Sequence, residues 1–230
     1  MKWGLFIAML LFSQVIVAKE PELTCEKIWG EMTWEGMEFH RYKLRAENFP
    51  PQKKFLLIVR SFDGTETETF TYNSNKKGHL ILEPVENTPQ DIYAICPAKR
   101  GERLTFVMKS DELAFSADVV PFPLEMKSKK GVKLNLELQG DKGEKFFLTG
   151  DGFKANETVE LACKIDEQTL PFEAFITPLG ELIAYITLPD EQEGGKAKLI
   201  LKRKKEEVIF PFDWGAPALK IVGACCFEIK

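Results

Sequence analysis

The chain has 230 residues, of which 44% are hydrophobic, and its formal net charge at pH 7 is −4. That length and apolar content are sufficient for one or two hydrophobic cores. The slightly negative charge is mixed along the chain, which argues against a nucleic acid as the partner.

Residues 1–18 have the pattern of a secretory signal peptide. Lys2 supplies the positive start, an apolar run follows, and Ile16 and Ala18 stand at the positions before cleavage that favour small or apolar residues. The run is short for a hydrocarbon core of about 30 Å, and no later stretch is long enough to span one. We therefore expect cleavage after Ala18 and an exported product, either periplasmic or secreted and associated with the cell envelope.

From Glu38 onward, short runs rich in β-branched and aromatic residues alternate with turn signals, which is typical of an all-β protein. Asp63-Gly64 is a strong signal for a two-residue hairpin turn. The first half predicts strands over residues 39–44, 55–62, 65–72, 79–82, 92–95, 104–108 and 113–119.

The second half repeats this order. Phe49 lies 14 residues before Asp63, and Phe153 lies 13 residues before Asp166. Gly78 and Gly180 follow at corresponding positions, as expected of a diverged duplication. The predicted strands here cover residues 134–138, 145–148, 159–165, 172–177, 182–188, 197–201 and 208–212.

About seven short strands per ~100 residues is the pattern of an immunoglobulin-like sandwich. The predicted fold class is therefore all-β, with two tandem immunoglobulin-like β-sandwich domains after the signal peptide. The predicted boundaries are a signal peptide over 1–18, a first sandwich over 19–126, a polar linker over 127–131 and a second sandwich over 132–230 that includes a C-terminal strand or tail.

Residues 150–159 read Gly-Asp-Gly-Phe-Lys-Ala-Asn-Glu-Thr-Val. This segment resembles the G-x-G-F-x-x-x-E-x-V turn of bacterial immunoglobulin-like repeat domains of exported proteins. The resemblance implies that Phe153 plugs the end of the sandwich and that the glycines take positive φ. In the first copy Ala46 and Asn48 replace the glycines, and asparagine tolerates left-handed geometry. The resemblance also implies a scaffold without an activity, and a bacterial source.

All five cysteines follow the signal peptide, and an odd number leaves at least one thiol free or paired with another chain. We expect a disulfide between Cys25 and Cys96, because both lie in the first half. Cys225 and Cys226 are adjacent and therefore poorly placed to bond each other, so they suit cross-links to other chains. Their segment, residues 218–229, is either the last strand of the second sandwich or an arm that adds to a neighbour's sheet.

Residues with catalytic or metal-binding chemistry are sparse. His40 and His79 are expected to be partly buried strand residues, since no third ligand at a fixed spacing completes a zinc site. Cys163 shares a strand face with apolar residues and is expected to be a core residue. We expect no cofactor and no metal. Acidic pairs, such as Glu66 with Glu68, occur at several turns and strands without indicating a catalytic pair.

A cationic hairpin tip is the clearest charged feature. It could contact the phosphates of lipid or glycan, or it could be an ordinary solvated turn. The candidate anion-binding residues are Lys202, Arg203, Lys204 and Lys205.

These patterns predict a non-enzymatic binding or structural module of the cell envelope, with a protein or an envelope glycan as partner. One alternative is a periplasmic assembly factor or chaperone that presents sheet edges to client strands. An apolar groove left open near residues 218–229 would favour it. A second alternative is a small hydrolase, which two close carboxylates with shifted pKa values in a cleft would favour.

Overall fold

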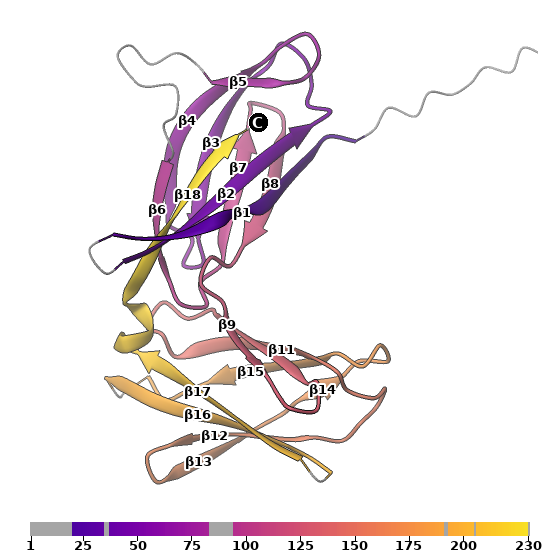
Figure 1. Cartoon of the computed structure of the whole chain (residues 1–230), viewed down its shortest axis with the longest axis vertical. Coiled ribbons are helices and arrows are strands. Elements are labelled where there is room, and N and C mark those ends of the chain that lie inside the picture. The colour runs from indigo at the N-terminus through magenta and orange to yellow at the C-terminus, as the bar shows by residue number, and fades with distance from the viewer. Residues whose placement is uncertain (1–19, 35–36, 83–93, 191–192, 205, 230) are drawn as a thin grey trace, which may run out of the picture.

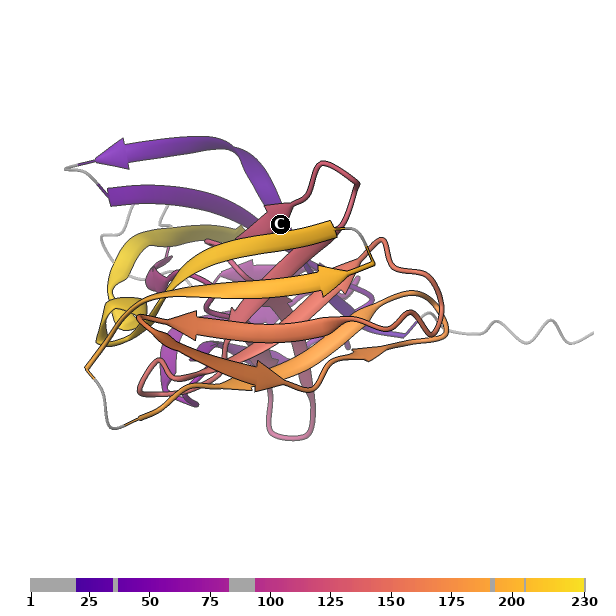
Figure 2. The ribbon, with the colours of Figure 1, turned by 90° about the horizontal axis from the view of Figure 1, so that it is seen from below.

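The structure is a computed structural model that describes residues 20–34, 37–82, 94–190, 193–204 and 206–229. The predicted signal peptide lies outside these residues. Figure 1 shows two β-sandwiches, one above the other, and this confirms the predicted all-β fold class. Figure 2 views the molecule from below, with the second sandwich in front of the first.

The second sandwich has the strand order of an immunoglobulin-like domain. Its sheet C runs in the order β14 (Phe175–Ile176), β15 (Leu182–Thr187), β11 (Lys145–Asp151), β10 (Lys133–Leu138) and β9 (Leu124–Lys127). Its sheet D runs in the order β13 (Gln168–Phe172), β12 (Glu160–Ile165), β16 (Gly194–Arg203) and β17 (Glu206–Gly215). Hydrophobic residues alternate along these strands and meet between the two sheets.

The first sandwich is built on the same plan. Its sheet B runs in the order β5 (Leu80–Leu82), β4 (Glu66–Ser74), β3 (Lys54–Ser61), β7 (Leu104–Lys109) and β8 (Ala114–Val119). Its sheet A runs in the order β1 (Glu22–Trp34), β2 (Met37–Glu47), β18 (Ile221–Ile229) and β6 (Ala94–Lys99). Sheet A therefore contains the last strand of the chain.

This last strand, β18, is the main departure from the predicted boundaries. It lies between β2 and β6, parallel to the former and antiparallel to the latter. The corresponding strands of the second sandwich, β11 and β15, pair directly with each other. The prediction that the second sandwich extends to residue 230 is therefore wrong. After β17, the short 3-10 helix η1 (Ala216–Leu219) turns the chain back into the first sandwich (Figure 1).

The side chains of β18 explain why it returns. Cys225 and Phe227 are 0% and 2% exposed and belong to the core of the first sandwich. Gly223 passes so close to Glu38 that an added Cβ would collide with the Glu38 carbonyl oxygen. Burying a large apolar side chain such as Phe227 stabilises a fold by about 1.5–3 kcal/mol, so sheet A gains much of its core from this strand.

The predicted linker is also misplaced. Residues 128–131 form the turn of the β9–β10 hairpin, where the Ser128 amide donates to the carbonyl oxygen of Val132 at 2.7 Å. Gly131 takes a φ of 88° in this turn. The first sandwich instead joins the second through the four residues 120–123 between β8 and β9. A polar turn and a polar linker have the same composition, which explains the error.

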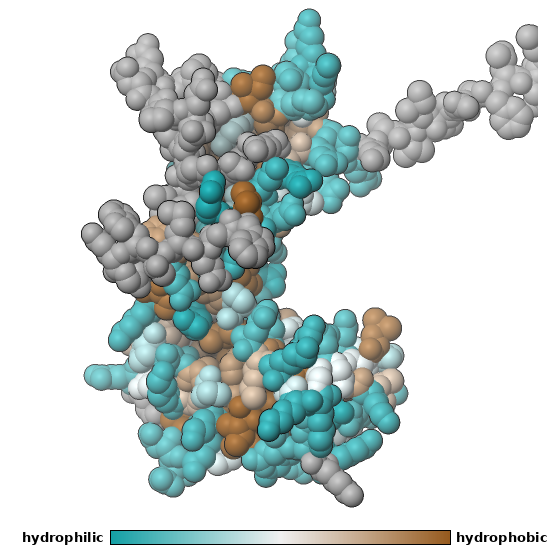
Figure 3. Space-filling model, in the orientation of Figure 1, coloured by the Kyte–Doolittle hydropathy of each residue, from teal (hydrophilic) through white to brown (hydrophobic). Residues whose placement is uncertain are grey.

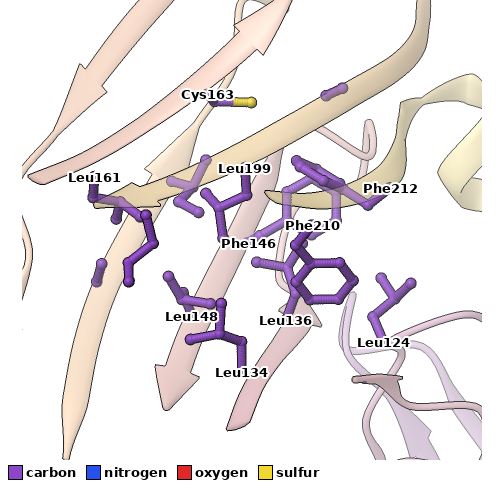
Figure 4. Close-up of a cluster of buried hydrophobic side chains, with 14 of the residues drawn as sticks. Leu124, Leu134, Leu136, Phe146, Leu148, Leu161, Cys163, Leu199, Phe210 and Phe212 are labelled. Atoms are coloured by element: carbon purple, nitrogen blue, oxygen red, sulfur yellow. The ribbon is translucent and has the colours of Figure 1, made fainter. Parts of the chain in front are cut away.

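Matching corners close the two sandwiches. Phe49 and Phe153 are both buried, and the residues before them, Asn48 and Gly152, have φ values of 57° and 91°. The carbonyl oxygen of Phe49 lies against Gly78, and the carbonyl oxygen of Phe153 lies against Gly180, so neither glycine has room for a side chain. The corner of the second sandwich closes its buried core, part of which Figure 4 shows as leucine and phenylalanine side chains from both sheets.

Candidate functional site

The two sandwiches meet in an elbow. Figure 1 shows sheet C between sheet D and the first sandwich, so the outer face of sheet C turns toward the first sandwich. The Leu138 amide donates to the Gly101 carbonyl oxygen at 2.9 Å. The guanidinium of Arg103 donates to the buried carboxylate of Glu137 at 2.7 Å. Phe62 of the first sandwich packs against the core of the second.

A shallow groove of about 790 Å³ runs over the outer face of sheet C. Alternation along the strands places Asn135, Phe147, Thr149 and Ile183 on this face, while their neighbours enter the core. Charged side chains of both signs surround this floor. They are Glu125, Lys127, Lys133, Asp151 and Glu181.

Asn135 is the polar centre of the floor. Its side-chain oxygen, Oδ1, is buried and has no hydrogen-bond partner within the described residues. Leaving a buried acceptor unsatisfied costs about 1–3 kcal/mol, so such atoms are rare without a reason. This oxygen is unsatisfied but also shielded from solvent, so a donor from a ligand reaches it only when the Asn135 side chain turns toward the groove.

Apolar side chains lie on the same face. Phe147 and Tyr185 are opposite each other on β11 and β15, with ring centroids 4.9 Å apart. Tyr185 is 72% exposed, and Phe175, opposite Ile183, is 63% exposed. Figure 3 shows apolar patches among hydrophilic surface on the second sandwich. An exposed and a half-buried aromatic ring beside an unsatisfied polar side chain is a combination that ligand sites use.

A second groove lies on the outer face of sheet B and brings together acids from separate parts of the sequence. Glu66 and Glu68 of β4 lie there with Asp111 and Glu112 of the β7–β8 turn. Glu66 accepts a hydrogen bond from Arg60 at 2.6 Å. A hydrogen bond from Lys53 lowers the pKa of Glu112, so that carboxyl is an ionised partner in an ion pair.

The predicted disulfide between Cys25 and Cys96 does not form. Both are free thiols, on strands β1 and β6, and strands β2 and β18 lie between them. Neighbouring strands are about 4.8 Å apart, so these two residues are well beyond bonding reach. The prediction paired the cysteines by their place in the sequence, which says nothing about sheet order.

The C-terminal cysteines do not form an exposed cross-linking arm. Cys225 is fully buried in the core of the first sandwich, so the predicted intermolecular cross-link is wrong for this residue. The backbone of Cys226 pairs with β2 and β6, and its side chain lies outside the described part. Cys163 is a buried core residue, as expected, and burial raises its pKa to about 12.

The cationic tip is engaged with acids of the same domain. Lys202 lies 3.9 Å from Glu207, and Lys204 lies 4.0 Å from Glu157. Arg203 has a side chain that is only 17% exposed, and it packs inward over the corner of the sandwich. Arg203 is therefore committed to the corner, whereas the side chains of Lys202 and Lys204 are 55% and 68% exposed, and anion binding by these two lysines stays a prediction. Lys205 lies outside the described residues.

The two histidines lie in different sheets of the first sandwich, His40 in sheet A and His79 beside sheet B. His40 on β2 is buried, stacks on Phe122 at 4.3 Å and has its Nδ1 2.6 Å from the Pro121 carbonyl oxygen. His79 precedes β5 and is exposed, so the expectation of partial burial is wrong for it. Within the described ranges, no group of three or more His, Cys, Asp or Glu residues is placed to hold a metal ion.

No family model and no curated protein matches the chain. Among solved structures, it is similar to a crystal structure of a tetra-tandem repeat in the extending region of a large adhesion protein. The identity is 8%, the TM-score is 0.30, and the match covers 86% of this chain and 50% of that chain. The match thus spans half the length of that structure. In the part of this chain that is described, no helix has the length and apolar content needed to cross a membrane.

Proposed function

We propose that this chain is an exported, non-enzymatic module of the cell envelope that binds a neutral glycan in the groove of sheet C. The observation that carries the proposal is the Phe147–Tyr185 ring pair on the outer face of sheet C, on the same face as the unsatisfied Asn135. Export rests on the signal-peptide pattern of residues 1–18.

The chemistry of the groove favours a glycan over a charged ligand. Its rim carries two cations, Lys127 and Lys133, and three acids, Glu125, Asp151 and Glu181. This near balance of charge provides no strong attraction for an anion or a cation. A sugar offers many hydroxyl donors for the acids, and an acetamido N–H would suit the Asn135 acceptor once that side chain turns toward the groove. The C–H faces of the sugar would pack on the Phe147–Tyr185 pair.

The elbow supports the proposal because it fixes the groove relative to the first sandwich. The chain crosses between the sandwiches twice, before β9 and again before β18, and Arg103 bonds to Glu137 beside the groove. A preorganised site loses less entropy when it binds a ligand. With the two sandwiches held in this way, the second could bind a glycan polymer while the first stays at a fixed distance from that polymer.

Binding of chitotetraose, a neutral N-acetylated oligosaccharide, tests the proposal by isothermal titration calorimetry. We expect saturable binding that weakens about fivefold or more in Asn135→Ala and in Phe147→Ala, since each removes an interaction of about 1 kcal/mol or more. Ile209→Ala, an exposed apolar residue on sheet D, is the matched control and should bind like wild type. Absence of saturable heat, or equal affinity in all three variants, would overturn the proposal.

An assembly factor is the second candidate, and one observation favours it. Sheet A takes a strand from a distant part of the chain between β2 and β6, as a chaperone sheet takes a client strand. That position is filled here, because Cys225 and Phe227 of β18 are buried, so the open groove that would favour a chaperone is not found at these residues. A labelled synthetic β18 peptide, added in excess to the full chain, distinguishes the two candidates: an assembly factor should exchange its own β18 for the peptide, whereas a module with a fixed β18 should not bind it.

A further inference from the structure

Cys96 and Cys225 lie directly opposite each other. They are partners in the antiparallel register of β6 and β18. Residues opposite each other in an antiparallel pair have Cα atoms about 4.5–5.5 Å apart. Disulfides need Cα separations of about 4.4–6.8 Å, so the backbone already has a separation that permits the bond.

Both side chains point into the same core. Cys96 is 8% exposed and Cys225 is 0% exposed, and both belong to the core of the first sandwich. A hydrogen bond from the thiol of Cys225 lowers the pKa of Cys96. Burial instead raises the pKa values of Cys25 and Cys163 to about 12, which keeps those two thiols protonated and unreactive.

We propose that Cys96 and Cys225 form a disulfide that fastens the returning strand β18 into the first sandwich. The bond would join the edge strand of sheet A to the last strand of the chain. It would then hold β18 in place and fix the second crossing between the two sandwiches. The inference rests on strand register and does not depend on the glycan proposal.

An external disulfide, such as oxidised glutathione, is the oxidant. The Cys96 thiolate attacks one sulfur of this disulfide, forms a mixed disulfide and releases one thiolate. Cys225 then loses its proton and its sulfur attacks the sulfur of Cys96, which releases the second thiolate. Two protein thiols and one external disulfide thus become one protein disulfide and two external thiols. Cys96 reacts first because β6 is the edge of sheet A and its thiol has the lowered pKa.

Thiol counting tests the proposal on the wild-type chain, without any variant. The reduced, folded protein is incubated with oxidised glutathione, alkylated after denaturation and digested for mass spectrometry. We expect the number of alkylated thiols to fall from five to three and a peptide pair joined through Cys96 and Cys225 to appear in the monomer. Five alkylated thiols, a different cysteine pair, or this pair only in a covalent dimer would each overturn the proposal.

Variants then localise the bond. Cys25→Ser and Cys226→Ser should each still lose two thiols on oxidation, whereas Cys96→Ser and Cys225→Ser should lose none. Hydrogen exchange of oxidised wild type should slow in β18 and return to the reduced rate after dithiothreitol. If exchange in β18 is the same in the oxidised and reduced chains, the bond does not fasten the strand.

Discussion

Arg203 holds the glycine-rich corner of the second sandwich. Its guanidinium donates to the carbonyl oxygen of Gly152 at 2.9 Å and lies 5.3 Å from the centroid of the Phe153 ring. Its Nε is 3.6 Å from a carboxylate oxygen of Glu157, whose other oxygen accepts the Lys154 amide at 3.0 Å. The cation of the hairpin tip therefore closes the corner through a stacking contact and an ion pair.

Glu157→Gln tests this corner. The hydrogen bond donated by the Lys154 backbone N–H, with the charge of Arg203 nearby, lowers the pKa of Glu157. The contribution of this carboxylate to stability is therefore present above its ordinary pKa of 4.5. That contribution is lost as the pH falls through the lowered pKa of the folded state. We expect the variant to lose about 1 kcal/mol of unfolding free energy at neutral pH.

Urea unfolding at neutral pH and at about pH 3 measures the effect, and the difference between wild type and variant should shrink in acid. Glu160→Gln, an exposed carboxyl on the neighbouring strand, is the control and should change little at either pH. A difference that is constant with pH would contradict the assigned role of Glu157.

At the scale of elements, the two corners show what the sequence could predict. Alternation located most strands, and the spacing of Phe49 and Phe153 located the matching turns. The sequence did not indicate β1, whose residues 22–34 mix charged and apolar side chains. It also could not place β18, because alternation shows that a strand has a buried face but not which sheet covers it.

The groove could not be predicted for a related reason. Asn135 is one of many polar residues in strands, and only the packing around it shows that its Oδ1 is buried without a partner. The aromatic pair joins residues 147 and 185, which come together through the register of β11 and β15. A single sequence does not fix that register.

Gly78→Ala tests the corner of the first sandwich. Gly78 has a φ of 78°, and a Cβ there would collide with the Phe49 carbonyl oxygen. Gly64 has a φ of 83°, but no atom lies within 4 Å of an added Cβ. Gly64→Ala should therefore cost only the backbone strain, roughly 1 kcal/mol, and Gly78→Ala clearly more, at about 3 kcal/mol. Thermal unfolding of both variants measures this, and equal losses would contradict the close packing of this corner.

At the scale of the whole molecule, the returning strand makes the two sandwiches depend on each other. Ala218 of η1 is buried in the second core, and Val222, at the start of β18, packs against the first. The first sandwich has its central strand supplied by a segment that follows the second sandwich in the chain. Domains joined in tandem usually contain all the strands of their own core and can fold one after the other. Here the first sandwich is complete only after the second has been synthesised, so we expect the stability of the first to depend on the segment that follows the second.

Hydrogen exchange on a chain that ends at Lys220, compared with the full chain, tests this dependence most directly. Without β18, strands β2 and β6 lose their shared partner and the core loses Cys225 and Phe227. We expect the amides of β2 and β6 to lose protection while those of sheets C and D keep theirs. Full protection of β2 and β6 in the shortened chain would contradict the claim that the C-terminal strand completes the first sandwich.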